Sequence, residues 1–184
     1  MLSQFIGSPE MNRLGDIDYD FPEGIHAIGR LDKESEGLLI LTNDKRVTRL
    51  LFSSKTPHKR TYLVMVKNVV SPEKLQELAT GVTISGKNGI DYTTPPCEVQ
   101  IVKKPVDLFE GAFEYIESWP HSWLTITVYE GKYHQIRKMV SAVGHRCQRL
   151  IRLSIEDMEL NDLQPGCVKE LGQQAFFKLL KIEQ

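Results

Sequence analysis

The chain has 184 residues, of which 41% are hydrophobic, and its formal net charge is −1. This length suits one ordinary domain or two small lobes with a shared core, and the hydrophobic content excludes wholesale disorder. No apolar run approaches the roughly 20 residues of a membrane helix, and no basic and apolar leader is recognisable at the start. Three widely separated cysteines (Cys97, Cys147 and Cys167) argue against a disulfide scaffold, so we expect a cytoplasmic protein.

In chain order, the first elements are short. Strands are predicted at 26–31 and 37–42, with charged residues between them. Asn43 or Asp44 can cap a helix that runs to Phe52.

The middle of the chain alternates strands with one helix. A β-branched and aromatic run predicts a strand over 60–68, and residues 81–84 and 97–103 predict two more. Residues 71–81 carry helix signals, with Ser at the N-cap, Pro at the first position and Gly beyond the end. The Gly- and Pro-rich segment 85–96 is predicted as a loop.

The last third changes its hydrophobic period twice. Residues 122–130 alternate with a period of two, which predicts a strand with one buried face. Residues 134–144 place apolar side chains at i, i+3, i+4 and i+7, which predicts a helix, and 147–155 returns to a strand pattern. A further helix is predicted over 173–182. The whole pattern predicts an α+β fold with a mixed, mostly antiparallel sheet flanked by helices.

The near-neutral total charge conceals two basic segments. Residues 45–60 and 131–152 each hold six Lys or Arg and no acid, whereas the first 44 residues hold nine acids and three bases. Such segments are typical of surfaces that bind phosphate backbones, although a solvated basic face has the same composition. Charge alone leaves both interpretations open.

Asp32 is the strongest candidate for chemistry. It follows a predicted strand, lies next to Arg30, and sits in a turn between two apolar runs. A rigid, partly desolvated carboxylate suits a nucleophile or a general base. A turn aspartate that bonds its own backbone would give the same local pattern.

Two further residues each allow a functional interpretation and a purely structural one. Arg137 lies at the border of a predicted apolar helix face, where it can reach a carboxylate or simply extend to solvent. Tyr62 lies within a predicted strand, where its ring can pack in the core or stack on a base.

Other chemistries find less support. His134, His145 and Cys147 are close in sequence but lack the paired spacing of a metal site, so no metal is expected. No nucleotide-binding glycine loop and no GxSxG motif is present, so we expect no cofactor if the protein is an enzyme.

Three motifs in one order carry a family resemblance. The stretches "GRLDKESEGLLILTND", "KRTYLVMV" and "EGKYHQIRKMVSAVGHRCQRLIRL" resemble the RsuA-type pseudouridine synthases, most closely the large-subunit (23S) ribosomal RNA pseudouridine synthase E branch. The resemblance extends from about Leu2 to the C-terminus. It implies a pseudouridine synthase catalytic fold in two lobes, with the active-site cleft between them, over residues 1–184.

The resemblance also implies roles for individual residues. Asp32 matches the catalytic aspartate, and Arg30 matches the arginine that helps to hold the flipped-out RNA. Tyr62 matches the tyrosine that stacks on the target uracil, and Arg137 the basic residue that pairs with the aspartate. Leu150 matches the apolar residue that lines the base pocket.

The implied activity is the isomerisation of uridine to pseudouridine in ribosomal RNA, by a cofactor-free monomer without membrane contact. The aspartate would act as a nucleophile at C1′ or as a base at C2′. An inactive RNA-binding or assembly factor, or a synthase for small-subunit rRNA or tRNA, is the alternative. We expect six residues of the basic segments to contact the RNA backbone: Lys59, Arg60, Lys132, His134, Arg149 and Arg152.

The chain departs from the family pattern at two places. The family's opening strand and the small S4-type RNA-binding domain of many relatives are expected to be absent. Glu156 stands where relatives usually have Gly, and the sequence alone offers no physical reason for it.

Overall fold

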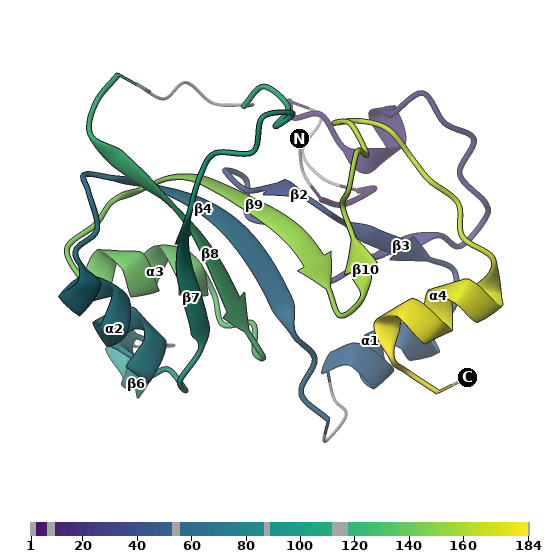
Figure 1. Cartoon of the computed structure of the whole chain (residues 1–184). Coiled ribbons are helices and arrows are strands. Elements are labelled where there is room, and N and C mark those ends of the chain that lie inside the picture. The colour runs from purple at the N-terminus through teal and green to yellow at the C-terminus, as the bar shows by residue number, and fades with distance from the viewer. Residues whose placement is uncertain (1–2, 7–9, 53–55, 87–88, 112–117, 184) are drawn as a thin grey trace.

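A mostly antiparallel sheet organises the computed structural model, which describes residues 3–6, 10–52, 56–86, 89–111 and 118–183 (Figure 1). Its strands follow the order β10-β9-β4-β8-β7, and β2 pairs in parallel with β9. The α+β prediction is confirmed. The bounds of these strands are β2 Glu36–Gly37, β4 Arg60–Lys67, β7 Glu98–Val102, β8 His121–Val128, β9 Cys147–Ile155 and β10 Met158–Glu159.

Two small antiparallel sheets complete the strand content of the described residues. They pair β1 (His26–Ile28) with β3 (Ile40–Thr42), and β5 (Thr83–Ser85) with β6 (Asp91–Thr93). The strand predicted over 37–42 is divided into β2 and β3, because its start pairs with β9 and its end pairs with β1. The loop predicted over 85–96 contains β6, because pairing with β5 overrides its Gly- and Pro-rich composition.

The four α-helices of the described residues lie near their predicted positions. They are α1 Arg46–Phe52, α2 Pro72–Thr80, α3 Gln135–Ala142 and α4 Gln173–Leu180, and a 3₁₀ turn spans Leu14–Asp16. The predicted caps are present: the Asp44 carboxylate accepts from Arg46 N at 2.9 Å, and Ser71 Oγ accepts from Lys74 N at 3.4 Å.

Each face of the central sheet is covered by a separate hydrophobic core. Along β4, Leu63 and Met65 belong to the core that includes α1 and α4, whereas Val64 and Val66 belong to the core that includes α2 and α3. Figure 1 shows the two helix pairs at opposite ends of the molecule. The prediction of one buried face for 122–130 is wrong, because Trp123 of β8 packs into the first core while its neighbours pack into the second.

The three cysteines are free thiols, as the sequence predicts. Burial raises the pKa of Cys97 and of Cys147 to about 11, so both stay protonated near neutral pH. Among the described residues, no helix is both long enough and apolar enough to cross a membrane.

Candidate active site

Asp32 lies in the loop that follows β1. Gly29 opens this loop with a φ of +71°. The Leu31 backbone is fixed by Ser3, whose hydroxyl accepts from Leu31 N at 3.1 Å and donates to its carbonyl at 3.0 Å. Ser35 N donates to the Asp32 carbonyl at 2.8 Å and closes a turn. The backbone around Asp32 is therefore fixed on both sides, and its side chain is 32% exposed.

An imidazole and a guanidinium neighbour this carboxylate. His134 Nε2 lies 3.5 Å from Asp32 Oδ1. His134 is the N-cap residue of α3, and its left-handed backbone (φ +53°) presents the ring, which stacks on Tyr133 at 3.9 Å. Arg152 of β9 is the second neighbour: burial lowers the pKa of its guanidinium, whereas Tyr62 and Asp32 act to raise it.

One face of the central sheet supplies the rest of the site. Tyr62 of β4 and Arg152 of β9 are register partners, and Tyr62 is half-buried beside the second core. Leu150 is buried in that core, two positions before Arg152 and therefore on the same face. Arg152 Nε donates to the Leu38 carbonyl at 2.8 Å. Its Nη2 is buried and has no hydrogen-bond partner among the described residues.

Arg137 does not pair with Asp32 in this structure, contrary to the expectation from the family pattern. Arg137 Nη2 donates to the Glu34 carbonyl, and Nη1 lies 3.8 Å from Glu34 Oε2. His134, one helical turn earlier, is the α3 residue that lies beside the Asp32 carboxylate. Arg137 Nε is buried without a hydrogen-bond partner in the described part of the chain.

Arg30 lies on the exposed side of the same loop. In the amide orientation that satisfies both groups, the Gln4 oxygen accepts from Arg30 Nη2 at 2.8 Å and from Nε at 3.2 Å. The structure thus directs Arg30 towards the N-terminal segment, next to Ser3, which also fixes the Asp32 loop.

Three residues expected on the RNA backbone are buried instead. Arg60, Arg149 and Arg152 are only 4–5% exposed. Their side chains turn inward from the central strands and find partners there: Arg60 donates to the His58 carbonyl at 3.0 Å and lies over the Phe52 ring. Phosphate contacts by these three arginines stay a prediction, which their burial does not favour.

The other three expected backbone contacts remain accessible. Lys132 is exposed, and Lys59 and His134 are partly exposed. Lys59 Nζ lies 3.7 Å from Asp157 Oδ1, and Lys132 Nζ lies over the Tyr92 ring. Lys55, a member of the first basic segment, lies outside the described residues.

Residues 11–142 match the model of the family described as RNA pseudouridylate synthase. The chain belongs to this family. The match contains Asp32, Tyr62 and Arg137, the three residues that carried the resemblance in the sequence.

Several curated members of the family are similar over most of the chain. Ribosomal large subunit pseudouridine synthase E of Vibrio parahaemolyticus is 36% identical over 172 residues, which cover 92% of this chain and 69% of that protein. The protein of the same name from Xanthomonas axonopodis pv. citri is 32% identical and is covered to 85%, with 90% of this chain. Ribosomal small subunit pseudouridine synthase A of Vibrio parahaemolyticus is 29% identical, with 86% of this chain and 60% of that protein covered.

Solved structures agree with the family fold. A crystal structure of a pseudouridylate synthase superimposes with a TM-score of 0.68 at 27% identity, over 88% of this chain and 63% of that one. A chain of a Cbf5-Nop10-Gar1 complex superimposes with a TM-score of 0.51 at 15% identity, over 76% of this chain and 43% of that one, which shows the fold alone.

One structural residue of this pseudouridylate synthase site escapes sequence analysis. Glu36 is one of the charged residues between the first two predicted strands, but its carboxylate is buried and lies 2.6 Å from Arg149 Nε. The signal was the glycine that follows it, because Gly37 allows the close approach of β2 to β9 that buries Glu36. The described residues contain no cluster of three or more His, Cys, Asp or Glu that could hold a metal.

Proposed function

We propose that this family member isomerises uridine to pseudouridine in 23S ribosomal RNA, with Asp32 as its catalytic residue. The relatives named large subunit pseudouridine synthase E, which are 31–36% identical, support this substrate class. The observation that carries the assignment of Asp32 is its position: a loop carboxylate held by backbone contacts beside His134 and Arg152.

The reaction needs an ionised carboxylate and a uracil free to turn. The N1–C1′ bond breaks, the uracil rotates, and a C5–C1′ bond forms. C5 then loses its proton and N1 gains one, so the isomerisation involves no net oxidation or reduction. Asp32 attacks C1′ as a nucleophile or removes the C2′ proton as a base. Arg152 brings a fixed, buried positive charge that interacts electrostatically with Asp32.

Tyr62 and Leu150 would receive the flipped uracil. Moving a base out of its stack costs about a few kcal/mol. Stacking on an aromatic ring returns about 1–3 kcal/mol of this, and the Tyr62 ring is half-buried against the core that contains Leu150.

Arg137 is proposed to exchange Glu34 for Asp32 when RNA binds. Its contact with the Glu34 carboxylate is long, at 3.8 Å, and that carboxylate is 71% exposed, so the pair is a weak one. Its buried Nε–H has no hydrogen-bond partner within the described part of the chain and is free to donate to a new acceptor.

The deciding experiment maps pseudouridines in cellular rRNA with and without the gene, and after replacement by Asp32→Asn. We expect one or a few sites in 23S rRNA to lose pseudouridine in both altered strains. Loss of pseudouridine at a site in 16S rRNA or tRNA would show that this RNA, and not 23S rRNA, is the substrate. Unchanged maps would support an inactive RNA-binding protein. The purified protein acting on 23S and 16S transcripts distinguishes a direct from an indirect effect.

A further inference from the structure

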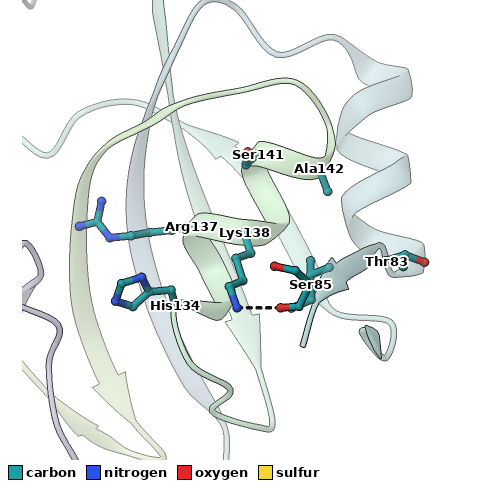
Figure 2. A pocket seen from close by; sticks show the side chains of 8 residues that line it. Thr83, Ser85, His134, Arg137, Lys138, Ser141 and Ala142 are labelled. Atoms are coloured by element: carbon teal, nitrogen blue, oxygen red, sulfur yellow. Dashed lines mark hydrogen bonds between the residues drawn. The ribbon is translucent and has the colours of Figure 1, made fainter. Parts of the chain in front are cut away.

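Two hollows follow one another along the exposed side of α3. The first, of about 410 Å³, lies between α3 and β5 (Figure 2). The second, of about 490 Å³, lies beside the end of the helix at residues 144–147. Arg137 and Ser141 line both hollows, so the two are contiguous. Together they are named the α3 track.

The α3 track begins at the catalytic loop. His134, Arg137, Lys138 and Ser141 follow the i, i+3, i+4, i+7 spacing that places side chains in one row of a helix. Figure 2 shows this row, with Lys138 reaching Ser85 of β5. His134 stands at its start, 3.5 Å from the Asp32 carboxylate. A strand that places one nucleotide at Asp32 therefore meets the α3 track with its neighbours.

The charge of the α3 track has one sign. Arg137, Lys138 and Arg146 line it, and no described residue that lines either hollow is acidic. Arg146 is exposed, and its side chain has no hydrogen bond or ion pair among the described residues. His145 Nδ1 contacts the Lys67 carbonyl at 2.9 Å, which directs Nε2 away from that carbonyl. These groups match a chain of phosphates.

An exposed aromatic ring lies at the same end as Asp32. The Tyr133 side chain is 74% exposed, unusually open for a large ring, and it stacks on His134. Lys138 Nζ lies 5.3 Å from the centre of the ring. A flat ring beside a row of cations is the combination that binds single-stranded nucleic acid, where bases stack and phosphates pair with the cations.

We propose that the α3 track binds the RNA strand next to the target uridine, with phosphates at Lys138 and Arg146 and an unpaired base on Tyr133. The identity of the strand rests on the proposed function. The occupant is single-stranded, because a base can stack on Tyr133 only after it leaves its helix.

The first test measures binding of a short oligouridylate in the Asp32→Asn background, where no product forms. Lys138→Ala/Arg146→Ala should lower the slope of log Kd against log salt by about 1.4, at about 0.7 per phosphate contact. The matched control is Lys169→Ala/Lys178→Ala, which removes two exposed lysines in and before α4. Equal slopes in both double variants would overturn the proposal.

A single substitution keeps the test valid if the double variant fails to fold. Lys138 Nζ donates to the Ser85 carbonyl at 2.7 Å, so its removal can loosen β5, whereas Arg146 has no side-chain bond among the described residues to lose. Arg146→Ala alone should lower the slope by about 0.7. An unchanged slope in a folded Arg146→Ala protein contradicts the proposal.

The second test concerns the ring. Tyr133→Ala should weaken oligouridylate binding about fivefold or more, as expected for the loss of one stacked base, and Tyr133→Phe should retain it. Tyr129→Ala is the control, because Tyr129 is also exposed but its hydroxyl donates to Glu98. Equal effects of Tyr133→Ala and Tyr129→Ala on binding would contradict the proposal that a base stacks on Tyr133. These binding results are independent of pseudouridine formation, so either proposal can fail alone.

Discussion

Glu36 and Arg149 form a buried ion pair that fastens the end of the Asp32 loop to the central sheet. Their atoms Oε2 and Nε are 2.6 Å apart, although 113 positions separate the two residues in the chain. The pair adjoins the parallel contact of β2 with β9, which begins four residues after Asp32. The position of the Asp32 loop therefore depends on an ion pair with Arg149, which lies far from it in the sequence.

Removing one partner of this pair should destabilise the protein strongly. Arg149→Met leaves the Glu36 carboxylate buried beside an apolar side chain, and we expect a loss of about 3–5 kcal/mol in the free energy of unfolding. Urea unfolding measures it. Glu36→Gln/Arg149→Met, which removes both charges, should recover part of the loss. A single variant as stable as the wild type would show that the pair contributes little.

Asp32→Asn should abolish pseudouridine formation and leave the fold intact. The side chain is 32% exposed and the loop is held through backbone atoms of Leu31 and Asp32, so the amide can replace the carboxylate without displacing its surroundings. Turnover on a 23S transcript, RNA affinity and thermal unfolding are the three measurements. Residual turnover comparable to the wild type would remove Asp32 from the mechanism.

Arg137→Ala should lower turnover much more than RNA affinity. The expected cause is loss of the cation that reaches Asp32 in the bound state, and Arg137→Lys should restore part of the rate. Glu34→Gln is the matched control, because it removes the carboxylate that lies 3.8 Å from Arg137 Nη1 but keeps the Glu34 carbonyl to which Arg137 donates, and it should not reduce turnover. A uniform loss of affinity with unchanged turnover would instead make Arg137 a phosphate contact.

Gly37→Ala should disturb both the fold and the site. Gly37 has φ +98°, and a Cβ there would lie 2.4 Å from the Arg152 carbonyl oxygen. Gly24→Ala is the control, since Gly24 has φ +76° with nothing within 4 Å of the added atom. We expect about 1–2 kcal/mol of lost stability at Gly24. At Gly37 the strain of the close approach should add about 2 kcal/mol. Equal losses at both positions, measured by urea unfolding, would mean that β2 can move away from β9.

Local signals in the sequence predict the elements better than their partners. The caps of α2 and the apolar row of α3 depend on neighbouring residues, and both predictions are confirmed. The burial of Arg149 depends on Glu36, which reaches it only through the β2–β9 pairing. A count of basic residues cannot distinguish such a buried arginine from a phosphate contact. For the same reason Asp32 could be proposed from its turn, but its neighbours His134 and Arg152 could not be ranked before the fold was known.

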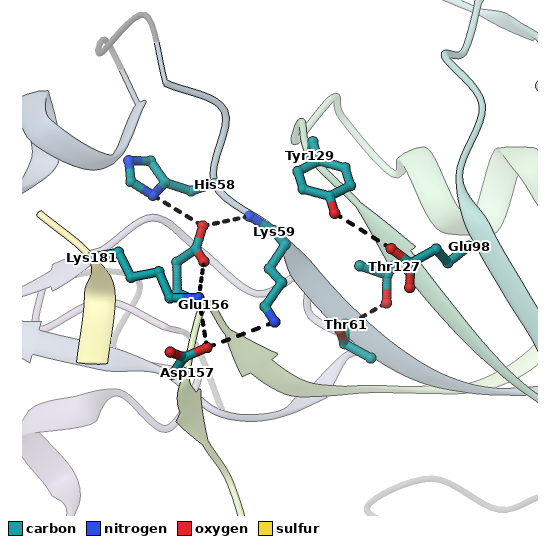
Figure 3. A network of polar contacts seen from close by, with 9 residues as sticks. All are labelled: His58, Lys59, Thr61, Glu98, Thr127, Tyr129, Glu156, Asp157 and Lys181. Carbon is teal, nitrogen blue, oxygen red and sulfur yellow. Dashed lines mark hydrogen bonds and ion pairs between the residues drawn. The ribbon is translucent and has the colours of Figure 1, made fainter. Parts of the chain in front are cut away.

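Glu156 combines a strained backbone with a buried carboxylate, and the two can be separated. It occupies the β9–β10 turn at φ +51°, a conformation that favours the Gly usual in relatives. Its carboxylate accepts from Lys59 N at 2.9 Å and lies 3.1 Å from His58 Nδ1 and 3.5 Å from Lys181 Nζ (Figure 3). The side-chain contacts offset the backbone strain.

Glu156→Ala should lose the three carboxylate contacts and keep the left-handed backbone strain. We therefore expect a loss of about 1–3 kcal/mol in the free energy of unfolding. Glu156→Gly loses the same contacts but relieves the left-handed strain, so it should be more stable than Glu156→Ala by about 1 kcal/mol. Urea unfolding of the two variants beside the wild type gives both terms. Equal stability of the Gly and Ala variants would contradict the inference that the left-handed backbone at position 156 is strained. A Gly variant as stable as the wild type would show instead that relief of the strain equals the full contribution of the carboxylate to stability.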